Sequence, residues 1–206
     1  REHILTRPDT YIGDIEETKE SMWTLNIKED DTNNLNFKMK KKNIKFVPGL
    51  LKLFDEIIVN SRDHSVNDKS CDTIKVEVNT EENYITVFNN GNNGIPVEEH
   101  PKFKVSVPSM IFGQLLTSSN YDDTKKRTVG GRNGYGSKLV NVFSTKFTVK
   151  IGDPNNKKLF EQTWTDNMSV IGKETIKKYN KKCGFTEVTF YPDLEKFGIK
   201  SLGDHY

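Results

Sequence analysis

Residues 48–64, PGLLKLFDEIIVNSRDH, carry the clearest helical signal in the chain. Apolar side chains recur there at the spacing of one helix face, at Leu50, Phe54, Ile57 and Ile58. Pro48 suits the first helical position, because that position needs no N–H donor. The pattern predicts a long amphipathic helix whose apolar face packs on the rest of the fold.

Three polar residues, Glu56, Asn60 and Asp63, follow one another at intervals of four and three within this otherwise apolar helix. Such intervals bring side chains onto one stripe of a helix. A carboxylate can orient a water molecule, and a neutral amide oxygen can ligate Mg²⁺ without adding charge, so the stripe suits a magnesium–nucleotide site. An ordinary solvent-facing helix surface uses the same residue types, so the stripe alone does not decide between the two interpretations.

Alternating apolar residues after this helix predict a sheet. The segments TIKVEV (73–78) and YITVFN (84–89) alternate around the turn NTEEN and predict a β-hairpin. Further elements are predicted as strands at 145–151, 158–166 and 185–192 and as helices at 107–118 and 137–144. Helices mixed irregularly with hairpins favour an α+β fold, a two-layer sandwich in which a mixed, mostly antiparallel sheet carries helices on one face.

Length and composition favour a single domain spanning residues 1–206. Residues 26–43, NIKEDDTNNLNFKMKKKN, lack periodicity and are predicted to form a polar surface excursion rather than a domain boundary. Hydrophobic residues make up 33 % of the chain, with no apolar run long enough to cross a membrane, so no membrane partner is expected. Cys71 and Cys183 have no metal-ligand spacing and are interpreted as thiols in a reducing compartment.

The charge balance argues against a DNA-binding domain as such, because the net charge is only +2. The densest basic segment, KMKKKNIK at 38–45, could contact DNA or form solvated surface. Charge runs are most simply solvated, so the surface interpretation is favoured.

The stretch GGRNGYGSK at 130–138 holds four glycines and three residues that can contact anions. Glycine-rich loops let several backbone N–H groups converge on a phosphate, although glycine clusters also form plain turns. The P-loop pattern fails, because Ser137 and Lys138 stand in the reversed order after Gly136. The dinucleotide fingerprint fails too, because its third glycine is missing. The stretch is a phosphate-loop candidate outside both classes.

Two neighbouring segments point to the same kind of site. NNGNNGIP at 89–96 follows a predicted strand and permits close backbone approach by a ligand, or forms a generous turn. The segment 115–138 is rich in hydroxyls and glycines without apolar periodicity, so it is either a surface loop or a lid over a ligand, its lid portion being 117–133.

Three motifs follow one another along the chain: the helix motif E-x-x-x-N, the asparagine–glycine turn and the glycine loop. Their order resembles the ATP site of the gyrase, histidine-kinase, MutL and ninety-kilodalton heat-shock chaperone superfamily. Longer motifs resemble eukaryotic-type DNA topoisomerase II more narrowly. These motifs are RPDTYIG (7–13), VPGLLKLFDEIIVN (47–60), MIFGQLLTSSNYDD (110–123), VGGRNGYGSKLVNVFSTKFTV (129–149) and FYPDLEKF (190–197). The resemblance covers almost the whole chain except 26–43, and it implies a Bergerat-type ATP-binding fold.

The resemblance implies roles for individual residues, with ATP and Mg²⁺ as ligands. By this resemblance, Glu56 orients and activates the attacking water, and Asn60 ligates the Mg²⁺. Asn89 stands at the adenine-reading position, and Asp63 lies near the sugar and base. The other implied nucleotide contacts are apolar walls, a strand threonine, and lid and loop residues: Ile95, Ile111, Phe112, Thr186, Ser118, Ser119, Asn120, Gly131, Arg132, Asn133, Gly134, Tyr135, Gly136 and Lys138.

The sequence departs from the family pattern at three places. The turn at 89–96 carries one residue more than the family's N-N-G-x-G-I-P, which leaves the positions of Asn92 and Asn93 open. His64 stands where the family commonly has an asparagine near the nucleotide. Val129 stands where a threonine or serine is usual before the glycine loop.

The resemblance implies the N-terminal ATPase region of a nuclear, homodimeric enzyme in which ATP closes a gate and powers passage of one DNA duplex through another. It also implies that a γ-phosphate-binding lysine belongs to a following transducer domain, that DNA cleavage lies outside the chain, and that the arm exchanged between subunits precedes residue 1. Because such a cation stabilises developing charge, the chain alone is expected to bind ATP with little turnover. It is also expected to be largely monomeric and to meet double-stranded DNA through the full enzyme.

Two rival function classes share parts of this pattern. A protein kinase or chaperone with the same ATP fold would need a phosphoacceptor-histidine segment or a chaperone lid, and neither pattern is visible in the sequence. A non-enzymatic nucleotide- or DNA-binding protein would not depend on Glu56 for turnover, so replacement of Glu56 separates it from an ATPase.

Overall fold

The computed structural model describes residues 1–29, 35–115 and 135–205. Its helices are α1 (Glu2–Thr6), α2 (Pro48–Asn67), α3 (Val107–Gly113) and α4 (Gly136–Val142), with short 3-10 turns η1 (Pro8–Thr10), η2 (Leu194–Phe197) and η3 (Leu202–His205). Its strands are β1 (Thr18–Glu29), β2 (Leu35–Phe46), β3 (Ile74–Asn79), β4 (Tyr84–Asn90), β5 (Ser144–Asp153), β6 (Lys158–Thr165), β7 (Val170–Ile171), β8 (Thr175–Lys178) and β9 (Phe185–Pro192).

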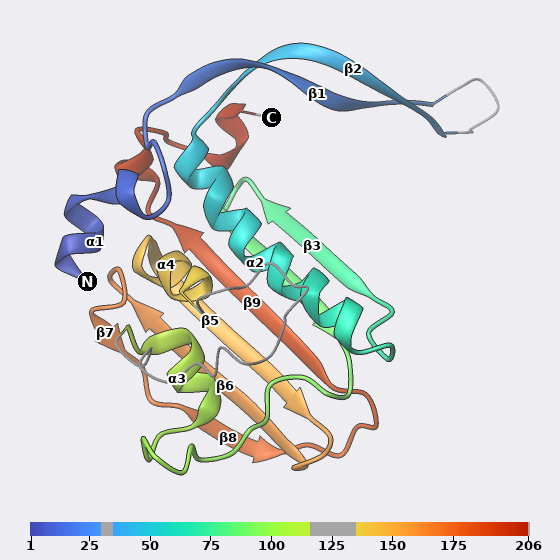
Figure 1. Ribbon diagram of the computed structural model, residues 1–206, viewed down its shortest axis with the longest axis vertical. Coiled ribbons are helices and arrows are strands. Elements are labelled where there is room, and N and C mark those ends of the chain that lie inside the picture. Colours follow the sequence, from blue (N-terminus) through green and yellow to red (C-terminus); the bar gives the residue numbers. More distant parts are fainter. Residues whose placement is uncertain (30–34, 116–134, 206) are drawn as a thin grey trace, which may run out of the picture.

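The main sheet has the strand order β3-β4-β9-β5-β6-β7, and β8 also pairs with β6. Every pairing among the described strands is antiparallel. The helices α2, α3 and α4 lie across one face of this sheet (Figure 1). The predicted α+β fold, with helices on one face of an antiparallel sheet, is therefore confirmed.

The core lies between the sheet and these helices. Along β4 the buried positions alternate, with Ile85, Val87 and Asn89 facing inward, as expected for a sheet covered on one side. The neighbouring strands add aromatic side chains to the same layer, and those with at most 1 % exposure are Phe147, Phe160, Trp164 and Phe190. The polar Asn89 at the end of this otherwise apolar inward row marks where the core gives way to a cavity.

The helix predicted from residues 48–64 begins at Pro48, as predicted, and continues to Asn67. Its start is held by a hydrogen bond from the Gly49 N–H to the carbonyl of Asp14, at 2.7 Å. Of the predicted apolar face, Ile57 is buried, as is the neighbouring Leu53. The other predicted positions, Leu50, Phe54 and Ile58, are partly buried against the core. The helix therefore presents its other exposed and half-buried positions to solvent and to the cavity.

The helix predicted at 107–118 is shorter than expected and ends at Gly113. A side chain at Gly113 would collide with the indole ring of Trp164 on β6, so a glycine lets the end of α3 lie directly on the core. Gln114 already has an extended backbone. Residues 116–118 lie outside the described residues.

The prediction for residues 26–43 was wrong in its local structure. Instead of an irregular excursion, β1 and β2 pair in a continuous antiparallel register from Thr18–Phe46 to Glu29–Leu35. The hairpin does lie on the surface, and it projects away from the sheet and helices (Figure 1). Alternation was hard to recognise because both sides of the hairpin mix polar and apolar residues: Lys41 lies opposite Trp23 on one side, and Met22 lies opposite Lys42 on the other.

Candidate nucleotide site

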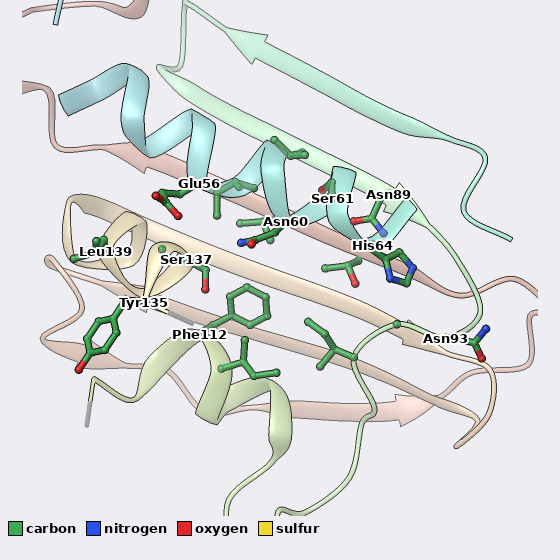
Figure 2. Close-up of a pocket in the computed structure, with 18 residues that line it drawn as sticks. Glu56, Asn60, Ser61, His64, Asn89, Asn93, Phe112, Tyr135, Ser137 and Leu139 are labelled. Atoms are coloured by element: carbon green, nitrogen blue, oxygen red, sulfur yellow. The ribbon is translucent and has the colours of Figure 1, made fainter. Parts of the chain in front are cut away.

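A cavity of about 630 Å³ opens between α2, α4 and the end of α3, above the inner face of β4 and β9. That volume lies in the usual range for small-molecule sites. Nine of the residues singled out from the sequence line it, namely Glu56, Asn60, Asn89, Ile95, Ile111, Phe112, Tyr135, Gly136 and Thr186. Figure 2 shows Glu56 and Asn60 along α2 at one end of the cavity, with Asn89 and His64 toward the other.

The cavity face of α2 is rotated from the predicted stripe. The lining positions are Glu56, Ile57, Asn60, Ser61 and His64, and Asp63 is not among them. At about 100° per residue, these five positions span about 140° and centre close to His64, whereas Asp63 points about 90° away from that centre. The structure does not bring Asp63 to the described cavity wall, where His64 lies, and a contact of Asp63 with the nucleotide stays a prediction.

The floor of the cavity is polar at the ends of two paired strands. Asn89 on β4 and Thr186 on β9 are direct cross-strand partners, and both line the cavity. Asn89 is 5 % exposed, and its side-chain amide donates to the carbonyl of Asn90 at 3.1 Å. Beside this polar pair, Ile95, Ile111 and Phe112 form apolar walls. A flat ring with polar edges suits such a combination.

The turn at 89–96 resolves the place of the extra residue. Asn92 points away from the cavity: its N–H donates to Ser70, its side-chain oxygen accepts from the N–H of Gly184, and its carbonyl accepts from Asn155. Asn93 and Gly94 line the cavity. The turn thus accommodates its additional residue with Asn92 bonded on the outer side, while Asn93 and Gly94 remain at the cavity.

Asp68, just beyond the end of α2, holds this turn in place. Its carboxylate accepts hydrogen bonds from the backbone N–H of Asn93 at 2.8 Å and from the N–H and hydroxyl of Ser70. These hydrogen bonds, led by that of Asn93, hold the pKa of Asp68 well below its usual range. His64 Nε2 lies 3.6 Å from the same carboxylate and packs against Gly91. The His64 ring leaves no room for a side chain at Gly91, whose φ of 141° also favours glycine.

We expect Asp68→Asn to lower the melting temperature near pH 7 and to weaken nucleotide binding, because the turn that carries Asn93 loses its anionic acceptor. Since the folded-state pKa of Asp68 is lowered, its contribution is complete above the unfolded value of about 4 and is lost as the pH falls below it. Thermal unfolding of both proteins from pH 7 to pH 3 checks this: the difference should shrink with acid. A difference that stays constant over this range would contradict it. Asp72→Asn is the control for nucleotide binding, because the pKa of Asp72 is also lowered, chiefly by a hydrogen bond from Asn90, and Asp72 does not line the cavity.

Glu56 and Gly136 meet at the opposite corner of the cavity. The Glu56 carboxylate forms an ion pair with Lys52 Nζ at 2.6 Å, and this hydrogen bond raises the pKa of Lys52. Gly136 begins α4 directly against the other oxygen of Glu56, so close that any side chain at position 136 would overlap the carboxylate. The glycine thus places the end of the former glycine-loop candidate against the candidate base.

Lys138, expected at the phosphates, is not among the residues that line the cavity. It is 6 % exposed, and its Nζ lies 5.8 Å from the ring centroid of Tyr135, which lines the cavity. Burial lowers the pKa of Lys138. A contact of Lys138 with the phosphates stays a prediction.

Several expected contacts lie outside the described residues. They are Ser118, Ser119, Asn120, Gly131, Arg132, Asn133 and Gly134, together with Val129. Conversely, the cavity includes residues that the sequence analysis did not assign to it: Ile57, Ser61, His64, Val87, Asn93, Gly94, Ser137, Leu139 and Val188. Of these, Ser61 and His64 could have been found from their helical spacing to Ile57 and Asn60, whereas the others depend on tertiary packing.

The oxygen and nitrogen donors that line the cavity fit a magnesium–nucleotide complex in which the nucleotide supplies most of the metal ligands. The described residues contain no cluster of three or more histidine, cysteine, aspartate or glutamate side chains that could hold a metal. Asn60 contributes one amide oxygen to the cavity. Mg²⁺ commonly keeps several waters and binds through one or two protein oxygens plus substrate phosphates, so a single amide beside a phosphate-sized space is compatible with it.

In the described part of the chain, none of the helices combines the length and apolar character of a membrane crossing. Comparison with known families matches residues 47–196 to the family described as histidine kinase-, DNA gyrase B-, and HSP90-like ATPase.

Similar proteins include DNA topoisomerase 2-alpha of Gallus gallus, 55 % identical over 201 residues, which cover 98 % of this chain and 12 % of that protein. DNA topoisomerase 2 of Drosophila melanogaster is 51 % identical over 203 residues, which cover 98 % of this chain and 13 % of that protein. The chain therefore spans only a small part of the length of these relatives.

Among solved structures, the ATPase region of Saccharomyces cerevisiae topoisomerase II matches with a TM-score of 0.88 and 48 % identity, over 99 % of this chain and 52 % of that chain. The 43K ATPase domain of Thermus thermophilus gyrase B matches with a TM-score of 0.66 and 22 % identity, over 97 % of this chain and 41 % of that chain. The second match concerns the fold alone.

Proposed function

The chain belongs to the family of histidine kinase-, DNA gyrase B- and HSP90-like ATPases, and from this premise we propose that it is the ATP-binding and ATP-hydrolysing domain of a eukaryotic-type DNA topoisomerase II. In the proposed enzyme, ATP binding closes a homodimer, and the cycle of binding and hydrolysis drives passage of one DNA duplex through another in the nucleus. The chain acts as one domain, and DNA cleavage belongs to other parts of the enzyme.

The observation that carries the proposal is the corner formed by Glu56, Asn60 and Gly136. Successive turns of α2 present the carboxylate of Glu56 and the amide of Asn60 to the same cavity. Because residue 136 is a glycine, the start of α4 can lie directly against the Glu56 carboxylate. Terminal phosphates placed along this edge would lie beside both groups. Phosphoryl transfer to water depends mainly on such positioning.

In the proposed reaction, Glu56 accepts a proton from the attacking water and holds that water in line with the terminal phosphoryl group. Asn60 holds the amide oxygen that Mg²⁺ would use, and the metal, when bound, neutralises charge on the phosphates. Asn89 and Thr186 contact the polar edge of the adenine, and Ile95, Ile111 and Phe112 cover its faces. The residues outside the described ranges, such as Asn120 and Arg132, complete the phosphate contacts.

We expect Asn60→Ala to weaken the binding of a non-hydrolysable ATP analogue in the presence of Mg²⁺ by at least about tenfold, because the metal loses its protein ligand. Titration calorimetry with and without Mg²⁺ measures this, and the effect should disappear when the metal is removed. Asn67→Ala makes the same chemical change on the same helix outside the cavity and is the matched control. Equal effects of the two changes, or an effect of Asn60→Ala that persists without metal, would reject the metal role of Asn60.

A further inference from the structure

Ser61 is a buried hydroxyl residue on the cavity wall that has no role in the proposed reaction. It is 6 % exposed, and it lines the cavity together with its helix neighbours Asn60 and His64. Figure 2 shows Ser61 on α2 between these two residues, toward the end of the cavity that holds Asn89. Burial of a hydroxyl is unfavourable unless it forms a hydrogen bond, so the bonding of this group decides what it can do.

The Ser61 hydroxyl has no hydrogen-bond partner among the described residues. A serine inside a helix commonly donates to a carbonyl of the preceding turn, as Ser65 does to Arg62 at 2.7 Å. In the same described ranges, the fully enclosed side-chain polar atoms without a partner are His64 Nε2, Asn141 Oδ1 and Trp164 Nε1. Ser61 Oγ is not one of them, so it has an open side, which faces the cavity that the residue lines.

Ser61 ends the row of α2 that faces the sheet. The buried positions of this helix are four residues apart, and their row runs through Leu53 and Ile57 to Ser61. About one turn later, His64 packs against Gly91, which follows the end of β4. The row therefore leads from the apolar core to the end of the cavity where β4 stops.

The two strands that face this end of the helix change character in the same way. On β4 the inward row passes from Val87 to Asn89, and on β9 it passes from Val188 to Thr186. Val87 pairs with Val188, and Asn89 pairs with Thr186. The helix and both strands thus replace an aliphatic side chain with a polar one at the same end of the cavity, where a flat ring can form hydrogen bonds along its edge.

The orientation of Asn89 determines which hydrogen bond is left for Ser61. The side-chain amide of Asn89 donates to the carbonyl of Asn90 at 3.1 Å, which leaves its Oδ1 as an acceptor. On the edge of adenine, the amino group N6 is a donor and the adjacent ring nitrogen N1 is an acceptor. An acceptor at Asn89 that meets N6 therefore needs a donor beside it for N1, and a hydroxyl can supply that donor.

We propose that the Ser61 hydroxyl donates a hydrogen bond to ring nitrogen N1 of adenine and thereby raises the affinity for ATP. The inference rests on the proposed function in one respect, namely that the cavity binds the adenine of ATP. N1 supplies the partner that no described residue gives to Ser61, and Ser61 supplies a donor to a ring nitrogen that loses its water on binding. Removal of one member of such a pair leaves the other buried and unsatisfied.

Titration calorimetry on the full-length protein tests the contact with three non-hydrolysable nucleotides. The β,γ-imido analogue of ATP carries N1, its 1-deaza counterpart has a C–H group in place of N1, and its 7-deaza counterpart keeps N1 but lacks a different ring nitrogen. We expect Ser61→Ala to weaken the binding of the ATP and 7-deaza analogues by about tenfold. The same change should alter the affinity for the 1-deaza analogue by less than about twofold, because the contact is already absent.

Ser65→Ala is the matched control, because Ser65 lies on the next turn of α2 and does not line the cavity. It should leave the affinity for all three nucleotides within about twofold. Since alanine favours helix, Ser61→Ala should also keep the melting temperature of the nucleotide-free protein close to the wild-type value.

Equal losses of affinity for the analogues with and without N1, or no loss at all in Ser61→Ala, would overturn the proposal. An N1-dependent loss in Thr186→Val that is absent from Ser61→Ala would also overturn it, since Thr186 would then be the donor. A wild type that binds none of the three nucleotides rejects the proposed function, whereas intact binding that Ser61→Ala leaves unchanged rejects the role of Ser61 alone.

Discussion

Glu56→Gln is expected to lower ATP turnover by about 100- to 10,000-fold while leaving the affinity for ATP within about twofold, because glutamine keeps the size of the side chain but cannot accept a proton. The cavity places Glu56 beside Asn60 and against Gly136, so we expect its carboxylate to act at the terminal phosphate rather than at the adenine. Single-turnover and steady-state hydrolysis should be measured in the full-length protein, since the resemblance places a further phosphate-binding lysine beyond this region.

Asp55→Asn is the matched control for this experiment. Asp55 is adjacent to Glu56, also bonds Lys52, at 3.3 Å, and does not line the cavity. Its replacement changes the same charge near the same lysine and should leave turnover within about threefold. If Glu56→Gln hydrolysed ATP at the wild-type rate, or if both variants lost activity equally, Glu56 would not be the base.

Gly136→Ala is expected to lower turnover at least about 100-fold with a loss of stability of no more than about 1 kcal/mol. The added methyl group would occupy the space of the Glu56 carboxylate. Because that carboxylate is the end of a flexible side chain, it can move aside at little cost to the fold. It would then leave the position from which it holds the attacking water.

A double-mutant cycle tests whether Gly136→Ala lowers turnover through Glu56. If Gly136→Ala acts through Glu56, adding it to Glu56→Gln should cause little further loss of turnover. Gly203→Ala is the control for adding a methyl group at a glycine, because a side chain there meets only ordinary contacts with Thr80 and Ser201, far from the cavity lining. Fully additive effects, or a large fall in melting temperature for Gly136→Ala, would show that position 136 acts on the fold instead.

The family and most of the secondary structure could be predicted because they depend on local patterns. The helix from Pro48 combines a strong apolar period with proline at its first position, and β4, which follows it in the chain, alternates clearly. The hairpin of β1 and β2 was missed because its apolar residues face solvent and carry no burial signal. When both sides of a strand are exposed, neither side must be apolar, so the sequence shows no regular alternation from which the strand and its register could be predicted.

The candidate site was predicted in part for a related reason. Glu56 and Asn60 were predicted because a polar pair four residues apart stands out on an otherwise apolar helix. The cavity face centres close to His64, with Glu56 at its margin and Asp63 about 20° beyond Glu56, so the way the helix lies on the sheet decides which of them lines the cavity. Lys138 shows the same limit, since a position on the first turn of a short helix can face either phosphate or core.

By itself, the sequence determined the long helix, the antiparallel strands, the pair Glu56 and Asn60, and the membership of an ATPase family, because helical and strand periods and contiguous motifs are properties of neighbouring residues. Only the tertiary structure decided that Gly136 closes on Glu56, that Asp68 holds the turn of Asn93, and that Asn89 meets Thr186 at the cavity floor. These contacts join residues 25 to 97 positions apart, and their geometry follows from how the helices lie on the sheet rather than from any local pattern.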